Sequence, residues 1–430
     1  MNYEAALRHL EGHINLEAKA GRWEGLSLDR IRSMMHVMGD PHLANPVIHV
    51  TGTNGKGSTS LMITELIKAR GLQVGTYSSP HLERINERIR VNGVPLDDEA
   101  FAAAIAAVAE LEPLVDGALS HFEVLTAAAF GYFAEIAVDV AVIEVGLLGR
   151  WDATNVVDGA VAVVTNIGRD HTDGVGEWRR AIATEKAGII KPDSMLVLGE
   201  TSLELRDVFL AEPSAGLVER GVHFDATNSR VAIGGRAADL RGPYGQYDDV
   251  FIALHGAHQV DNASLALAAT ETFFGGPLDD DVVREAFAAV QVPGRFEIMR
   301  RHPLVVLDAA HNPDGARVAA RTLDDDFGVG GRVLVIGLLQ GRDIADMLDA
   351  LDASRAEMVV VCEPDWPRRI PAAEIAAVAA AKGIAVEVIR PIEDAVQRAL
   401  AIADDDDVVL VTGSNYVIGP ARRSLRRPRQ

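Results

Sequence analysis

The chain has 430 residues, of which 48% are hydrophobic and 24% are charged, and its formal net charge is -21. This length exceeds that of one ordinary hydrophobic core and predicts two or three domains. The acidic balance argues against a nucleic-acid-binding protein, which would present a basic face. The single cysteine, Cys362, excludes an intrachain disulfide and a cysteine metal cluster.

The start of the chain resembles neither a signal peptide nor a membrane anchor. Residues 1–21 are polar and mixed in charge. No apolar run reaches the roughly 18 residues that a membrane-spanning helix needs. We therefore expect a cytoplasmic protein with no membrane partner and, given its charge, no nucleic-acid partner.

The first two thirds of the chain alternate between strand-like and helix-like segments. Apolar residues at helical spacing predict helices at 58–71, 97–112 and 122–137. Short apolar or β-branched runs predict strands at 46–51, 73–79, 138–146 and 159–167. The last two runs are continuously apolar, as is typical of parallel strands buried on both faces. This alternation predicts a parallel sheet flanked by helices.

The alternation pauses and then begins again. Residues 202–254 are less regular and richer in glycine and short β runs, before helical patterns return at 258–274 and 278–290. The stretch "QVPGRFE" at 291–297 then interrupts the chain with a Pro-Gly pair, so we predict an interdomain linker at 293–297. Beyond it, a second and smaller α/β domain is predicted by strand candidates at 304–309, 332–338, 357–362, 384–389 and 407–413.

A glycine-rich loop lies between the strand predicted at 46–51 and the helix predicted at 58–71. In "GTNGKGST", only two residues separate Gly52 from the pair Gly55-Lys56, whereas a Walker A loop has four. Glycines let backbone N–H groups approach phosphate oxygens, and a helix start adds unpaired N–H donors. Lys56 supplies a cation, and either Ser58 or Thr59 supplies a hydroxyl. Strand and helix on either side favour a phosphate-binding loop over a plain glycine-rich turn.

A second candidate site residue is Glu144, which ends an otherwise apolar strand. A charge there is unfavourable unless it is paired or bound to a metal. Ligands of open α/β sheets gather at the carboxyl ends of the strands, and Mg²⁺ prefers oxygen ligands. We therefore interpret Glu144 as a Mg²⁺ ligand, with a salt bridge to a neighbour as the alternative.

The loop resembles the ATP loop of the Mur-ligase superfamily, specifically that of its folate branch. Further blocks resemble that family in the same order, namely 77–93, 121–130, 143–157, 170–176, 185–191, 258–263, 293–297, 308–313 and 411–416. The resemblance implies an α/β fold with a P-loop-containing, Mur-ligase-like central domain built on a parallel sheet. It also implies a smaller C-terminal Rossmann-like domain. On this basis residues 1–292 are the ATP- and acceptor-binding part and residues 298–430 the glutamate-ligase domain.

The reaction implied by the resemblance joins the amino group of L-glutamate to a carboxylate of dihydropteroate or a reduced folate. ATP is the co-substrate that first converts the carboxylate into an acyl phosphate, and two Mg²⁺ sites are implied. A monomer is expected. Two other functions stay open: a Mur-type ligase for a different acceptor acid, and an ATP-dependent switch that forms no amide.

The resemblance also assigns residue roles. It implies that ATP is bound by Thr53, Asn54, Gly55, Lys56, Gly57, Ser58, Asn262, Arg295, Asp308 and His311. It implies metal ligands at Ser79, Glu144 and His171. The catalytic residues that it implies are Lys56, Lys186 and His171, and Lys186 would carry a carbamate formed with CO₂. The acceptor would be held by Ser120, His121, Phe122, Glu123, Trp151, Asp152 and Ala153.

Several of these residues have a structural alternative. A serine before proline is commonly a turn residue, and a lone histidine is commonly structural. Lys186 could form an ordinary ion pair with Glu185 or another acid, and His311 and Asn312 could cap the start of a helix. Aromatic residues such as Phe122 commonly belong to the core.

Three positions depart from the family pattern. Leu148 replaces a glycine in "GLLGR", and Trp151 stands where a smaller apolar residue is usual. Both flank the predicted acceptor site, so they bear on which acceptor the protein uses. In "QGRD", Arg342 stands where lysine is usual, and this exchange is not neutral at a coordinated site.

Overall fold

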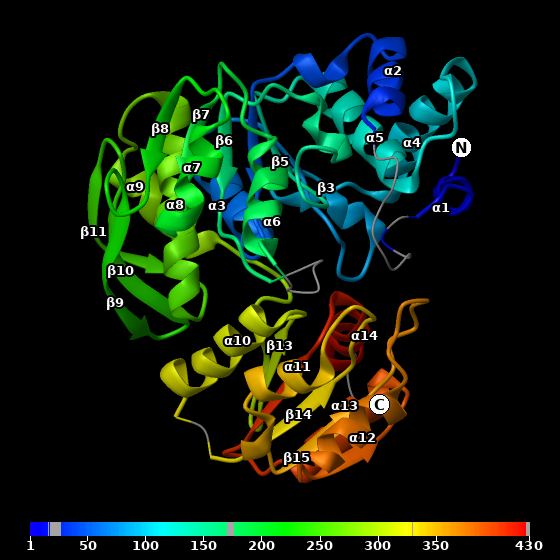
Figure 1. Cartoon of the computed structure of the whole chain (residues 1–430), viewed down its shortest axis with the longest axis vertical. Coiled ribbons are helices and arrows are strands. Elements are labelled where there is room, and N and C mark those ends of the chain that lie inside the picture. The colour runs from blue at the N-terminus through cyan, green and yellow to red at the C-terminus, as the bar shows by residue number, and fades with distance from the viewer. Residues whose placement is uncertain (16, 18–26, 170–175, 329, 427–430) are drawn as a thin grey trace.

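The computed structural model describes residues 1–15, 17, 27–169, 176–328 and 330–426. Two α/β parts are separated along the long axis of the molecule in Figure 1, and the part that follows residue 296 is coloured yellow to red. Each part is built on its own sheet, and a small third sheet lies at the side of the first part. None of the helices in the described ranges combines the length and the apolar character needed to cross a membrane.

The first sheet contains the strands predicted around the glycine-rich loop. In chain order its strands are β1 (Val47–Thr51), β2 (Val74–Tyr77), β3 (Ile89–Val91), β4 (Val94–Pro95), β5 (Val140–Glu144), β6 (Val161–Val164), β7 (Met195–Leu198) and β8 (Gly216–Glu219). They are arranged in the order β4-β3-β2-β5-β1-β6-β7-β8. The pairs from β2 to β8 are parallel, whereas β3 and β4 form an antiparallel edge. The predicted parallel sheet is therefore confirmed.

Helices cover both faces of this sheet. They are α1 (Tyr3–Glu11), α2 (Asp29–Val37), α3 (Lys56–Ala69), α4 (Asp98–Leu111), α5 (His121–Glu135), α6 (Trp178–Ala187), α7 (Leu203–Leu210), α8 (Ala257–Phe274) and α9 (Asp280–Ala289). One hydrophobic cluster joins α3, α8 and α9 to strand residues such as Val50 and Val142. A second joins α1, α2, α4 and α5 to residues such as Tyr77 and Ile143, which point to the opposite face. All five residues of β1 and of β5 are buried, as the continuous apolar runs predict.

The irregular stretch 202–254 contains one element that the sequence pattern did not predict. Its short β runs form β8 and a three-stranded antiparallel sheet of β9 (Asp225–Ala232), β10 (Gly235–Arg241) and β11 (Gln246–Ile252). Its start, however, folds as the helix α7. The eight residues of α7 bury Leu205, Val208 and Phe209, a repeat too short to stand out in the sequence.

The second part has six strands in the order β12-β13-β17-β14-β15-β16. Their bounds are β12 (Glu297–Arg301), β13 (Leu304–Asp308), β14 (Arg332–Ile336), β15 (Met358–Val361), β16 (Val386–Val388) and β17 (Val408–Thr412). The helices are α10 (Pro313–Asp326), α11 (Ile344–Ala350), α12 (Ala372–Ala381), α13 (Ile392–Ile402) and α14 (Asn415–Arg426). β13 to β17 are mutually parallel and are the strands predicted from the sequence, while β12 is an added antiparallel edge strand.

A histidine is buried in the middle of the central strand β1. His49 has no exposed surface, and its Nε2 lies 3.0 Å from the hydroxyl of Thr154. Burial, reinforced by the positive charge of Lys191, lowers the pKa of His49 to about 3. The folded protein therefore keeps this imidazole neutral well below the pH at which the unfolded chain binds a proton.

This burial predicts a pH-dependent loss of stability. Because the unfolded state takes up the proton near pH 6.5, stability is lost as the pH falls from there toward the folded-state value. Between pH 7.5 and 5.0 the free energy of unfolding of the native chain should fall by about 2 kcal/mol more than that of His49→Gln. Urea unfolding at both pH values measures the difference. His36→Gln, which changes an exposed histidine, should keep the native decrease, and an equal decrease in His49→Gln would refute the assignment.

Candidate active site

The glycine-rich loop leaves the middle of the first sheet, between β1 and α3, and is held by the segment that follows β6. The backbone N–H groups of Thr53 and Asn54 donate to the carbonyl and side-chain oxygens of Asn166, at 2.9 and 3.0 Å. In return, the Thr165 hydroxyl donates to the carbonyl of Asn54 at 2.6 Å. These contacts give the loop a fixed shape.

Two glycines are required by this shape. Gly52 has a φ of +150°, and a Cβ at this position would lie 1.8 Å from the Thr165 hydroxyl oxygen. Gly55 has a φ of +83° and directly precedes α3, and a Cβ there would lie 2.5 Å from Oδ1 of Asn262. The Nζ of Lys56 donates to the carbonyls of Gly52 and Thr53, at 3.1 and 3.3 Å, so its cation lies over the loop.

Glu144 lies beside this loop, as the sheet register requires. It pairs with Val50 across the parallel ladder between β1 and β5 and is 5% exposed. The N–H of Ser79 donates to its carboxylate at 3.4 Å, and a Cβ on Gly57 would lie 3.4 Å from the same oxygen. Burial raises the pKa of Glu144, and the positive charge of Lys56 opposes this shift. The donor set of a buried carboxylate beside a serine fits a hard divalent cation.

Of the two other predicted catalytic residues, the structure describes Lys186 and does not describe His171. Lys186 lies in the last turn of α6, is 6% exposed, and donates from Nζ to the carbonyl of Gly52 at 2.7 Å. Its nitrogen is therefore placed against the glycine-rich loop, although α6 is distant in sequence. His171 falls in the range 170–175, outside the residues that the structure describes, and its metal role stays a prediction.

The second part contributes Asp308 and the start of α10. Asp308 ends β13 and accepts hydrogen bonds from the N–H groups of Phe296 and Ala310, both at 2.9 Å. Burial raises the pKa of Asp308, and the nearby guanidinium of Arg295 opposes the shift. His311 is held by a contact of 2.9 Å between its Nδ1 and the carbonyl of Ala309.

The start of α10 also reaches the loop across the two parts. Asn312 caps α10 by accepting from the N–H of Gly315 at 2.8 Å, and its Nδ2 donates to Oδ1 of Asn54 at 2.9 Å. Of the residues that open α10, Asn312 is thus the one that caps the helix. Two residues further along, the carboxylate of Asp314 accepts from the N–H of Arg169 at 3.0 Å. These contacts join the two parts directly beside the loop.

The predicted acceptor residues fall into two groups. Ser120 and Glu123 form a capping box at the start of α5, with the N–H of Ser120 donating to Glu123 at 2.7 Å. Glu123 also pairs with Arg30 at 3.3 Å. These polar groups therefore have structural partners that the pattern Ser-x-x-Glu could have signalled.

The other acceptor residues surround the carboxyl end of β5. Phe122 packs against Gly146, where a Cβ would lie 2.4 Å from the phenyl ring. Trp151 is 44% exposed, whereas Asp152 is buried and accepts from the N–H of Leu147 at 2.7 Å. His121 is also buried, and burial lowers its pKa to about 4.

One cavity of about 570 Å³ brings most of the predicted residues together. Its lining includes Thr53, Asn54, Gly55, Lys56, Gly57, Ser58, Ser79, Ser120, Phe122, Glu123, Glu144, Trp151, Asp152, Ala153, Asn262, Arg295, Asp308 and His311. Of the described predicted residues, His121 and Lys186 lie outside the lining. The glycine-rich loop, the predicted acceptor residues and residues of the C-terminal part thus face one space between the two parts.

The three departures from the family pattern also line this cavity. Leu148, Trp151 and Arg342 all face it. Leu148 has a φ of +62°, in the left-handed region that favours glycine, and its carbonyl accepts from the Thr51 hydroxyl at 2.9 Å. The backbone conformation suited to the family glycine is therefore present with a leucine in its place.

The sequence analysis missed a buried ion pair at the wall of this cavity. Arg88 is 1% exposed and donates to both carboxylate oxygens of Glu17, at 2.8 and 2.7 Å. Its Nε donates to Nδ1 of His81 at 3.0 Å, and Glu17 lines the cavity. Arg88 lies inside the block 77–93 that resembles the family, but its partner is 71 residues away, so no local pattern connects the two.

Comparison with known proteins agrees with this arrangement. The family described as Mur ligase middle domain matches residues 122–270, and the Mur ligase glutamate ligase domain matches residues 294–415. The dihydrofolate synthase/folylpolyglutamate synthase of Mycobacterium tuberculosis is 39% identical over 444 residues, which cover 94% of this chain and 91% of that protein.

Solved structures share the whole fold. Mycobacterium tuberculosis folylpolyglutamate synthase complexed with ADP has a TM-score of 0.93 and 37% identity, and 100% of each chain is covered. The bifunctional folylpolyglutamate synthase/dihydrofolate synthase of Yersinia pestis complexed with AMPPNP and Mn ion has a TM-score of 0.86 and 31% identity, covering 99% of this chain and 98% of that chain. The chain therefore belongs to the dihydrofolate synthase/folylpolyglutamate synthase family, the folate branch of the Mur ligases.

Proposed function

We propose that this protein is an ADP-forming ligase that adds L-glutamate to dihydropteroate, to tetrahydrofolate or to both. The observation that carries the proposal is the single cavity that joins the glycine-rich loop, Glu144 and the predicted acceptor residues. The relatives named above, one of which is complexed with ADP, support the same reaction. The division into residues 1–292 and 298–430, with a linker at 293–297, is part of this proposal.

The chemistry needs cations because two anions must meet. A carboxylate oxygen of the acceptor attacks the γ-phosphorus of ATP, and the bond to the β-phosphate oxygen breaks to release ADP. The amino nitrogen of glutamate then attacks the acyl carbon, the C–O bond to phosphate breaks, and inorganic phosphate and a proton leave. Phosphoryl transfer of this kind depends mainly on positioning and charge neutralisation.

The chain supplies these functions from several elements. We assign the backbone N–H groups of the loop 52–58 and the cation of Lys56 to the phosphates of ATP. Arg295 from the linker and Asp308 from the second part, which line the same cavity, are also assigned to the nucleotide. Asn262 lies against Gly55 and holds the loop from the side of α8.

A divalent cation fits beside the loop. Glu144 and Ser79 would hold it, because the buried carboxylate lies next to the segment where the phosphates are expected. Bound there, Mg²⁺ would neutralise phosphate charge during transfer. A second Mg²⁺ site that includes His171, and a carbamate on Lys186, belong to the proposal as predictions from the family resemblance. The Mn ion of the Yersinia pestis structure supports the use of a divalent metal.

The acceptor is assigned to the side of the cavity near α5 and β5. Phe122 and the exposed face of Trp151 are suited to contact a flat pterin ring. The capping box of Ser120 and Glu123 fixes the start of α5, so these two residues position Phe122. We also propose that the enzyme is a monomer and that it works in the cytoplasm.

Release of phosphate from ATP tests the proposed function directly. With Mg²⁺ present, release should require both L-glutamate and one of the two folate acceptors, and each product should gain the mass of one glutamate residue. Dihydropteroate and tetrahydrofolate are assayed in parallel to separate the two additions.

Two outcomes would contradict the proposed function. Phosphate release without glutamate and acceptor would indicate an ATP-dependent switch. Release with glutamate and only a non-folate acid would indicate a Mur-type ligase for another acceptor.

A further inference from the structure

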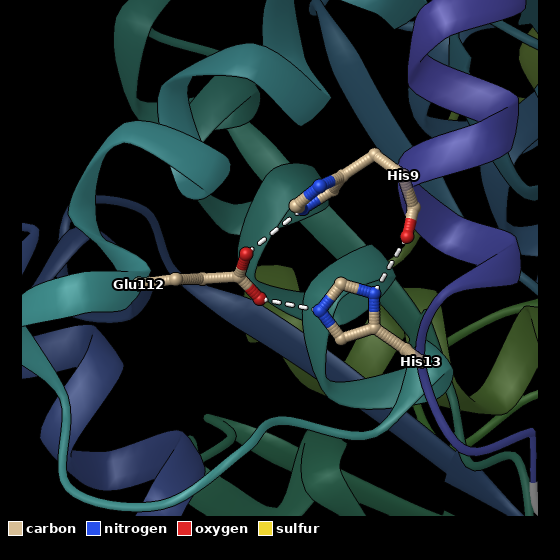
Figure 2. A group of neighbouring side chains, drawn as sticks. All are labelled: His9, His13 and Glu112. Carbon is tan, nitrogen blue, oxygen red and sulfur yellow. Dashed lines mark hydrogen bonds and ion pairs between the residues drawn. The ribbon is translucent and has the colours of Figure 1, made fainter.

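Three side chains that do not line the cavity form a compact group where the end of α1 meets the end of α4. His9 belongs to α1, His13 follows that helix, and Glu112 caps the end of α4 (Figure 2). The Nε2 atoms of His9 and His13 lie 2.8 and 2.7 Å from the two oxygens of the Glu112 carboxylate. All three ligand atoms lie within 4.8 Å of one another.

The local sequence explains why both imidazoles point to one carboxylate. His9 and His13 are four residues apart in "HLEGH", and the helical turn continues past α1, because the N–H of His13 donates to the carbonyl of Leu10 at 3.1 Å. Residues at this spacing share one face of a helix. The side chains are 26%, 13% and 18% exposed for His9, His13 and Glu112, so water reaches the group only in part.

The hydrogen bonds orient His13 as a ligand. Its Nδ1 lies 2.8 Å from the carbonyl of His9, and because a carbonyl only accepts, Nδ1 carries a proton. Its Nε2 lies 2.7 Å from a carboxylate oxygen, which also only accepts, so this contact needs either a proton on Nε2 or a cation in the proton's place. A histidine whose second nitrogen donates to a backbone carbonyl is the usual arrangement around a bound metal.

His9 adds a second and independent observation. Its Nε2 is buried and lies 2.8 Å from Glu112, yet it has no hydrogen-bond partner in the structure. A buried imidazole nitrogen thus faces a carboxylate oxygen without the alignment of a hydrogen bond. Two nitrogen lone pairs and one anion that converge on a shared point require either protons or a cation between them.

We propose that His9, His13 and Glu112 bind a first-row transition-metal dication of the Zn²⁺ class. Imidazole and carboxylate together suit Zn²⁺ or Co²⁺, whereas Mg²⁺ selects oxygen ligands. Three protein ligands leave a fourth position for water. The site joins α1 to α4, and the next residue, Ile14, accepts from the N–H of His121 at 3.1 Å, so the metal would hold α1 against the start of α5.

Binding of Co²⁺ to the full chain tests the site. The chelator-treated protein carries Glu144→Gln, which weakens the predicted cation site of the cavity, and is titrated with Co²⁺ in excess Mg²⁺. Equilibrium dialysis gives the amount bound, and the visible absorption of Co²⁺ reports nitrogen ligands. Zn²⁺ should displace the bound Co²⁺.

Matched variants assign the binding to these residues. In the Glu144→Gln protein, the further substitution His36→Gln changes an exposed histidine on α2. This protein should still bind one equivalent of Co²⁺. Adding His9→Gln or His13→Gln should weaken that binding by at least about 100-fold. Zn²⁺ should raise the midpoint of thermal unfolding in the His36 variant and not in the His13 variant.

Two results would overturn the proposal. One is the absence of Co²⁺ binding in the Glu144→Gln protein. The other is equal binding in the His13 and His36 variants. Either would leave the group as an ion-pair network that holds protons in place of a metal.

Discussion

Glu144→Gln should lower folate- and glutamate-dependent phosphate release by on the order of 10³-fold, which corresponds to about 4 kcal/mol of transition-state stabilisation. The amide keeps the size of the side chain but removes the negative charge that lies beside Ser79 and the glycine-rich loop. The cavity then lacks the anionic ligand that we assign to the divalent cation. The decrease is measured as kcat at saturating ATP, glutamate and acceptor.

The fold should survive this substitution. Glu144 is buried and burial raises its pKa, so a neutral amide meets no greater desolvation than the carboxylate does. Circular dichroism and the urea midpoint should therefore stay near those of the native chain. Glu65→Gln, which changes a residue of α3 paired with Lys68 at the surface, serves as a control with native turnover. Native turnover of Glu144→Gln at saturating Mg²⁺ would remove Glu144 from the metal site.

Glu17→Gln should reduce the free energy of unfolding by about 3–5 kcal/mol, the usual effect of removing one partner from a buried ion pair. The reason is the unequal burial of the two partners. Arg88 is 1% exposed, whereas the side chain of Glu17 is 27% exposed. Loss of the carboxylate leaves a guanidinium in the interior without its counter-charge, and water cannot reach it.

A double variant distinguishes the effect of leaving one buried charge unpaired from the effect of losing the ion pair itself. Glu17→Leu with Arg88→Met replaces both charges by apolar groups, which is often close to neutral for stability. It should therefore be more stable than Glu17→Gln, although it changes more atoms. Urea unfolding of the three proteins measures the order. A loss below about 1 kcal/mol in Glu17→Gln would place the Arg88 charge in contact with solvent.

Local patterns predicted much of the fold and part of the site. The continuous apolar runs at 138–146 and 159–167 correspond to β5 and β6, which are buried on both faces. The strand, glycines and helix around Gly52 and Gly55 predicted a loop whose backbone angles do require glycine. Backbone conformation and burial of a strand depend on a few neighbouring residues, so a single sequence carries this information.

The structure adds a structural role to some predicted site residues and an element to one irregular stretch. Ser120 and Glu123 were assigned to the acceptor from the family resemblance, and in the structure they also cap α5. The irregular stretch 202–254 proved to contain α7, whose eight residues are too few to show a clear helical period. The Ser-x-x-Glu pattern at 120–123 did carry a capping signal, whereas α7 offered no clear local signal.

The sequence by itself determined the α/β class, the parallel strands, the glycine-rich loop and the family to which the chain belongs. Only the tertiary structure decided that Arg88 pairs with Glu17, that Asn312 reaches Asn54 at 2.9 Å, and that Glu112 meets His9 and His13. Each of these contacts joins elements that are adjacent in space and distant along the chain. Their geometry depends on how whole helices pack against the sheets, and no short run of residues contains that information.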